Sequence, residues 1–152
     1  MIDSLILKLT LSNSKPNETI EIVVAGISMY PSIYNGDKIQ IQKSKTYAIG
    51  DIIIFTYKGD ELLVHRLLRV KNKTYFCKGD NAFRLEDINE DQILGKVVSV
   101  NGIVPLPWTK EMIDLSYQVN REYIKTRDTE KTKHTSAFLQ YQKALSLYYD
   151  HL

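Results

Sequence analysis

With 152 residues, of which 43% are hydrophobic and 25% charged, the chain has the composition of one globular domain with a real core, which excludes a disordered protein. Its formal net charge of +2 is too small to indicate a nucleic-acid partner by itself. The one cysteine, Cys77, excludes an internal disulfide framework and a metal site built from cysteines alone, and it suits a reducing cytoplasm. No cofactor or metal is expected.

The first 104 residues have the pattern of an all-β region, because β-branched and aromatic residues alternate with closely spaced turn signals. Residues 5–11 (LILKLTL) place leucine at every second position, a period of two that predicts a strand. The other predicted strands cover residues 19–26, 37–43, 51–58, 61–70, 74–79, 93–100 and 102–106. Seven or eight such strands close most naturally as a coiled antiparallel sheet or barrel, so we expect a mainly β domain over residues 1–104.

Residues 105–152 have helical periodicity instead. Pro107 suits the first turn of a helix, and a second helix is expected after the charged stretch 125–134. Apolar residues recur at helical spacing in both segments, namely Trp108, Met112, Leu115, Val119 and Tyr123 in the first and Phe138, Tyr141, Leu145 and Tyr148 in the second. We expect a helical extension that packs on the β domain or on itself, and a groove or partner surface is the sharper alternative.

Ser28 is the first residue that indicates chemistry. It follows Gly26 by two positions and precedes Pro31 by three, just before an Asn-Gly-Asp turn. Gly26 allows another chain to approach closely, and Pro31 restricts the backbone of the residue before it. A strand that simply ends here would give the same pattern as a nucleophile held at a strand-to-turn corner.

A serine nucleophile needs a base within reach, and His65 is the best candidate. It lies inside an apolar predicted strand, with Leu63 and Leu67 on its own face, whereas His134 and His151 lie in polar or terminal helical sequence. An imidazole is mostly neutral at pH 7 and can accept a proton. The alternative is a half-buried structural histidine bonded to a backbone carbonyl.

A carboxylate could orient that imidazole. Asp80 lies in the sequence Gly79-Asp80-Asn81, which is also an ordinary turn, and Asp87 is a weaker alternative. If neither approaches His65, the residues would form a Ser-His dyad.

Four short motifs follow one another along the chain: GISMYPSIYNGD at 26–37, GDIIIF at 50–55, VHRLLRV at 64–70 and KGDN at 78–81. Together they resemble the motifs of the type I signal peptidase family over roughly residues 20–100. The resemblance implies that Ser28 is the nucleophile and that His65 is the base, as in the archaeal and endoplasmic-reticulum branch. It also assigns the orienting role to Asp80.

The resemblance implies the coiled antiparallel β fold of that family and acyl transfer. Ser28 would attack a peptide carbonyl while His65 takes its proton and later protonates the leaving amine. The backbone N–H of Ser28 is then the expected oxyanion donor, with Met29 packing below it. Some bacterial relatives add a serine hydroxyl where this chain has Gly26, so Gly26, Ser28 and Met29 would meet the substrate edge through backbone groups.

Departures from the family bear on substrate and location. No stretch approaches the ~18 apolar residues of a membrane span, so we expect a cytoplasmic peptidase without an anchor. Residues 30–34 (YPSIY) are a small apolar stretch through which the protein could still contact a membrane surface. Self-cleaving repressor relatives use lysine where His65 stands and carry an upstream DNA-binding domain, for which the 27 residues before Ser28 leave no room. The expected partner is a soluble peptide or protein precursor that loses a leader segment, and not a nucleic acid.

Two other function classes compete with a serine endopeptidase. One is a catalytically silent β domain that binds an extended peptide by strand addition. The other, single-stranded nucleic-acid binding, draws on the ten tyrosines, but these spread into the helical segments instead of clustering on one strand face.

Overall fold

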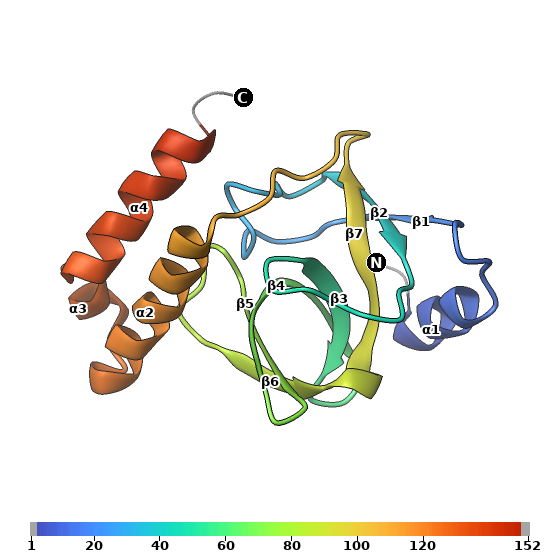
Figure 1. Cartoon of the computed structure of the whole chain (residues 1–152), viewed down its shortest axis with the longest axis horizontal. Coiled ribbons are helices and arrows are strands. Elements are labelled where there is room, and N and C mark those ends of the chain that lie inside the picture. Colours follow the sequence, from blue (N-terminus) through green and yellow to red (C-terminus); the bar gives the residue numbers. More distant parts are fainter. Residues whose placement is uncertain (1–2, 150–152) are drawn as a thin grey trace.

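A computed structural model describes residues 3–149 of the chain. Its strands are β1 (Ile20–Val23), β2 (Lys38–Gln42), β3 (Ile52–Tyr57), β4 (Glu61–Lys71), β5 (Thr74–Lys78), β6 (Glu86–Asn89) and β7 (Ile93–Val100). All neighbours pair antiparallel in one sheet of order β1-β2-β7-β3-β4-β5-β6, which curls into a half barrel (Figure 1). The mainly β fold with C-terminal helices that the sequence predicted is therefore confirmed.

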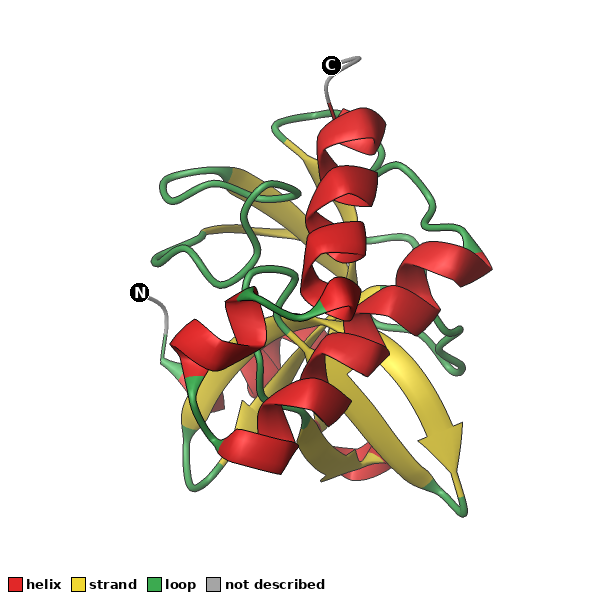
Figure 2. Cartoon of the chain, turned by 90° about the vertical axis from the view of Figure 1, so that its left-hand side faces the viewer, coloured by secondary structure: helices red, strands yellow, loops and turns green. Residues whose placement is uncertain are grey.

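The helices lie on two sides of this sheet. They are α1 (Ser4–Ser12), α2 (Lys110–Thr126), α3 (Thr129–Lys133) and α4 (Ser136–Tyr149), and a short 3₁₀ turn, η1 (Glu90–Gln92), precedes β7. In Figure 1, α2, α3 and α4 gather beside β5, while α1 lies beyond β7 at the opposite side. Figure 2 shows α4 upright, with α2 running obliquely behind its lower end.

Several predicted boundaries were wrong. Residues 5–11 form most of α1 and not a strand, because Leu7 and Leu11, four residues apart, face the core while Asp3 caps the helix. The Asp3 side chain accepts a hydrogen bond from the N–H of Leu5 at 2.9 Å. Leucine at every second position satisfies both periods, so the pattern alone could not exclude a helix.

Two further differences concern the ends of the sheet. The predicted strand at 102–106 forms only an isolated bridge, between Val100 and Ile103. The short strand β6 was missed. In the helical part, Thr109 caps α2, so Pro107 lies before the helix, and the charged stretch 125–134 contains α3.

The C-terminal helices pack around their own apolar cluster, whose buried members are Met112, Val119, Tyr141 and Leu145. Phe83, from the loop between β5 and β6, inserts into this cluster and stacks on Tyr123 with ring centroids 5.8 Å apart. The side-chain amide of Asn120 donates to the Phe83 carbonyl at 2.9 Å. The helices are therefore attached to the loop that follows β5, next to the residues described below.

Candidate active site

The structure brings Ser28 and His65 together. Ser28 lies in the turns between β1 and β2 and is exposed, whereas His65 lies in β4 and is 5% exposed. The Ser28 Oγ and the His65 Nε2 are 3.1 Å apart, within hydrogen-bond distance. A surface hydroxyl thus meets an imidazole that is almost wholly removed from solvent.

Local sheet geometry holds this imidazole. His65 pairs with Ile53 of β3, and the alternation of the strand places it on the face that carries Leu63 and Leu67. The ring of Phe55 approaches the imidazole edge-on, with centroids 6.1 Å apart. These neighbours restrict the rotation of the imidazole, so its nitrogens point in fixed directions.

Glu86 supports the other nitrogen of the same ring. The His65 Nδ1 and the Glu86 Oε1 are 2.6 Å apart, and the two side chains are 7% and 9% exposed. Leu67 of β4 pairs with Cys77 of β5, which pairs with Glu86 of β6, so the carboxylate reaches His65 diagonally across the intervening strand. With its proton on Nδ1 the imidazole donates to Glu86, and its Nε2 is free to accept from Ser28.

The expected orienting residue, Asp80, has a different partner. Its carboxylate is fully buried and binds the guanidinium of Arg66, with Nη2–Oδ2 and Nε–Oδ1 distances of 2.8 and 3.0 Å, and it also accepts from Ser32. Burial alone would lower the pKa of Arg66, but the charge and hydrogen bonds of Asp80 outweigh burial and raise it. The geometry therefore assigns Asp80 to Arg66. Asp87 alternates with Glu86 in β6 and faces solvent.

The turn around Asp80 instead holds the segment that carries the serine. The Asn81 N–H donates to the Ser28 carbonyl at 2.8 Å, and the Asp80 N–H points to the sulfur of the buried Met29 at 3.4 Å. A Cβ added to Gly79 would lie 2.6 Å from the Ser28 carbonyl oxygen, closer than real Cβ contacts allow. Only glycine fits here without a backbone shift.

Lys78 stabilises this turn from the protein interior. Its side chain is fully buried, and its ammonium donates to the carbonyls of Gly79 and Ala82 at 2.9 and 2.7 Å. Burial lowers the pKa of Lys78 to about 8, and the carboxylates of Asp80 and Glu86 offset part of that effect. Lys78 was not among the residues predicted from the sequence, although a charged residue between a strand and a turn is a visible signal.

The helices reach the same buried network. The Tyr141 hydroxyl of α4 donates to the Asp80 carbonyl at 2.6 Å, and the Tyr149 hydroxyl lies 2.9 Å from the Ser32 Oγ. The guanidinium of Arg66 lies 3.9 Å from the ring centroid of Trp108. The helical extension thus contacts residues that hold the segment with Ser28 in place.

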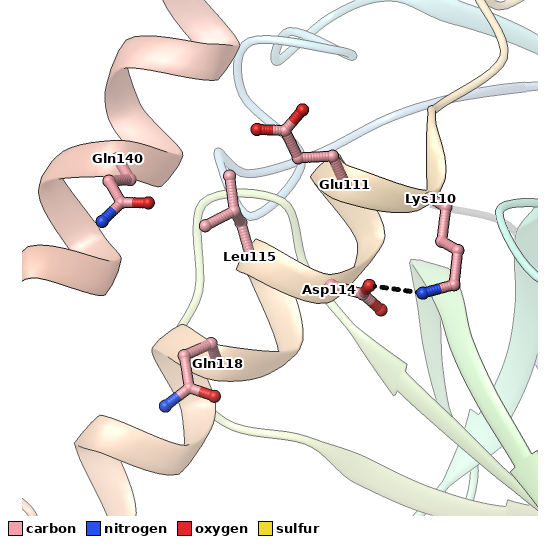
Figure 3. A pocket seen from close by; sticks show the side chains of 6 residues that line it. All are labelled: Lys110, Glu111, Asp114, Leu115, Gln118 and Gln140. Carbon is pink, nitrogen blue, oxygen red and sulfur yellow. Dashed lines mark hydrogen bonds and ion pairs between the residues drawn. The ribbon is translucent and has the colours of Figure 1, made fainter.

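A separate hollow of about 560 Å³ lies between α2 and α4 (Figure 3). Its lining consists of Lys110, Glu111, Asp114, Leu115, Gln118 and Gln140. Lys110 and Asp114 form an exposed ion pair at 2.9 Å, one turn apart on α2. Ser28 and His65 are not part of its lining, so this hollow is a surface feature of the helices.

A curled antiparallel sheet that presents a serine beside a buried histidine is a serine-peptidase-type fold. The model of the Peptidase S24-like family matches residues 3–98, more than half of the chain, and the chain therefore belongs to this family. The match ends within β7, before the helical extension. Curated proteins gave no match. Among the helices of residues 3–149, none has the length and apolar character needed to cross a membrane.

Proposed function

We propose that the protein is a serine endopeptidase that cleaves a peptide or protein precursor. Ser28 is the nucleophile, His65 is the general base, and Glu86 orients the imidazole and stabilises its protonated form. The observation that carries the proposal is the row of three side chains, with 3.1 Å between Ser28 Oγ and His65 Nε2 and 2.6 Å between His65 Nδ1 and Glu86 Oε1. Membership in a peptidase family supports the reaction class.

The proposed reaction has two halves. The Ser28 Oγ attacks the carbonyl carbon of the scissile bond while His65 Nε2 takes the hydroxyl proton, and the carbonyl oxygen becomes an oxyanion. When the C–N bond breaks, Nε2 returns this proton to the leaving amine, which leaves an acyl ester on Ser28. A water molecule, deprotonated by the same nitrogen, then hydrolyses the ester and restores the serine. Glu86 remains ionised and stabilises the imidazolium in both halves.

The oxyanion requires a donor beside Ser28. Within residues 3–149, the backbone N–H groups of Ser28 and Met29 donate to no protein acceptor. The Gly26 N–H, in contrast, is already bonded to the side chain of Asn35 at 2.8 Å, and glycine offers no hydroxyl. The Ser28 N–H is therefore the proposed oxyanion donor.

Within this reaction class we propose processing of a signal-like or leader segment in the cytoplasm, as in the histidine-base branch of the type I signal peptidases. His65 in its strand and the Gly79-Asp80-Asn81 turn support that assignment, because the turn packs against residues 28–34, which we call the nucleophile segment. Residues 1–104 would form the catalytic domain and residues 105–152 an extension of it.

Labelling with a small fluorophosphonate probe, read by intact mass, tests the proposal. The wild type is expected to gain one phosphonyl group, which is the mass of the probe less HF because fluoride leaves, and the variants Ser28→Ala and His65→Ala none, since both the nucleophile and its base are required. Ser32→Ala is the matched control, since Ser32 lies in the same segment but hydrogen-bonds to Asp80 instead of the imidazole, and it should still react.

Folded wild type that never reacts would instead support the catalytically silent, peptide-binding domain. Labelling that survives in Ser28→Ala would place the nucleophile elsewhere.

A further inference from the structure

A pocket of about 220 Å³ lies between the nucleophile segment and α4. The nucleophile segment contributes Tyr30, Pro31 and Tyr34 to its lining, and α4 contributes Gln142, Ser146 and Tyr149. Small-molecule sites usually enclose ~300–1,000 Å³, so the size of this pocket suits a single side chain better than a whole ligand. We call it the α4 pocket.

The α4 pocket is close to the reacting hydroxyl. Tyr30 follows Ser28 by two residues. Asn81, which also lines the pocket, holds the Ser28 carbonyl through its backbone N–H at 2.8 Å and the Ile27 carbonyl through its side chain at 3.2 Å. A peptide bound with its scissile bond at Ser28 would therefore pass the pocket within a few residues of that bond.

The helical wall of the pocket is anchored. The Tyr149 hydroxyl lies 2.9 Å from the Ser32 Oγ and accepts from the Trp108 Nε1 at 2.8 Å. One turn earlier Leu145 is buried, and two turns earlier Tyr141 bonds to the Asp80 carbonyl. Because both ends of this face are fixed to the nucleophile support, α4 presents Gln142 and Ser146 to the pocket at a set position.

The lining selects against charge. No residue that lines the α4 pocket is formally charged within the described part of the chain. The buried charges that Ser32 links to Tyr149 of the pocket, Arg66 and Asp80, neutralise each other 2.8 Å apart. A charged substrate side chain would lose hydration without gaining an ion pair, whereas an amide or hydroxyl could exchange hydrogen bonds with Gln142 and Ser146.

From these contacts we infer that the α4 pocket binds one uncharged substrate side chain that carries an amide or a hydroxyl, close to the scissile bond. This makes α4, which lies outside the residues matched by the family model, a specificity element of the peptidase. The inference rests on the proposed function, and it names a feature of the substrate that the serine and histidine alone would not select.

The test compares Ser146→Trp with Leu147→Trp in the full chain. The first variant fills the pocket, whereas Leu147 is the next residue, is 58% exposed and does not line it, so it is the matched control. Each protein is assayed by fluorophosphonate labelling, which does not require the pocket, and by mass-spectrometric profiling of cleavage in a mixed peptide library.

Wild type is expected to favour an amide or hydroxyl side chain at one position near the cleaved bond. Ser146→Trp should cleave such peptides about tenfold more slowly and lose the preference. Its labelling rate, like both activities of Leu147→Trp, should stay within about twofold of wild type. Gln142→Ala provides a milder second variant and should weaken the preference for amides without loss of thermal stability.

Each outcome decides between the two proposals. If Ser146→Trp cleaves the library as wild type does, or if wild type reacts with the probe but shows no such preference or no cleavage, the inference about α4 is wrong and the nucleophile assignment stands. If wild type fails to react with the probe at all, the proposed function is wrong and the inference falls with it.

Discussion

Replacing Glu86 by glutamine is the sharpest test of how His65 is activated. The carboxylate lies 2.6 Å from the Nδ1 of His65, and both side chains are less than one tenth exposed. In the proposed reaction the imidazole becomes a cation when it takes the proton of Ser28. Glutamine retains the size of the side chain and an acceptor for Nδ1–H, but it removes the negative charge that stabilises that cation.

The size of the effect follows from the charge separation. Two unit charges about 4 Å apart attract each other by about 4 kcal/mol at an effective dielectric constant of about 20, which is appropriate for partly buried pairs. Every ~1.4 kcal/mol of lost transition-state stabilisation lowers the rate about tenfold, so Glu86→Gln should slow acylation about 10³-fold. Thermal stability should change much less, because the glutamine side chain still offers an acceptor to the His65 Nδ1–H.

The assay is the pseudo-first-order rate of fluorophosphonate labelling, followed by intact mass, with circular dichroism as the check on folding. Asp87→Asn is the matched control, because it removes the same charge from the adjacent, exposed residue of β6, and it should react within about twofold of wild type. Folded Glu86→Gln that reacts at the wild-type rate would refute the reasoning and leave a Ser-His dyad. A slow Asp87→Asn would return the orienting role to Asp87.

Three further predictions concern groups packed around Ser28. Asp80→Asn should lower the free energy of unfolding in urea by about 3–5 kcal/mol, because it leaves the guanidinium of Arg66 buried without its counter-charge; a loss below about 1 kcal/mol would contradict this. Gly79→Ala should slow probe labelling about 10²-fold with an unchanged far-ultraviolet spectrum, since the new Cβ would displace the Ser28 carbonyl; an unchanged rate would show that the turn yields instead. Lys78→Met should alter the pH dependence of stability: the pKa of Lys78 is lowered from 10.5 to about 8, so between these values the unfolded wild type binds more protons and wild-type stability rises with pH. The free energy of unfolding of wild type minus that of Lys78→Met, both measured in urea, should rise by about 3 kcal/mol from the lower to the higher pH. Parallel pH curves for the two proteins would refute the pKa shift.

The strands and two site residues could be predicted because their signals are local. Alternation of polar and apolar residues located most strands of the sheet, including β4 with His65 on its apolar face. Ser28 was a candidate because it lies between a predicted strand and an Asn-Gly-Asp turn, but only the order of the four motifs favoured it as a nucleophile. The strand prediction for residues 5–11 was wrong for the opposite reason. Their apolar positions fit a strand and a helix equally, and only the core contacts of Leu7 and Leu11 decide between the two.

Glu86 could not be found from local pattern. It meets His65 only through the register of three strands, in which Cys77 is the intermediate. The strand that carries it has four residues and a single apolar one, Ile88, so it resembles a loop in sequence. The one available signal was alternation, which places Glu86 and Ile88 on the same inner face and turns the residue between them outward.

The motif that suggested Asp80 as the partner of the histidine has a different physical role. The turn Gly79–Ala82 bonds to the nucleophile segment through the Asn81 N–H and the Ser28 carbonyl, and to α4 through the Asp80 carbonyl and the Tyr141 hydroxyl. Its conformation is therefore fixed from the sheet, the nucleophile and the helices at once, and its buried carboxylate neutralises a guanidinium within that support. Within residues 3–149 the imidazole hydrogen-bonds to Ser28 and Glu86 and to no group of this turn, so the carboxylate beside the histidine can come from another strand, which here is β6.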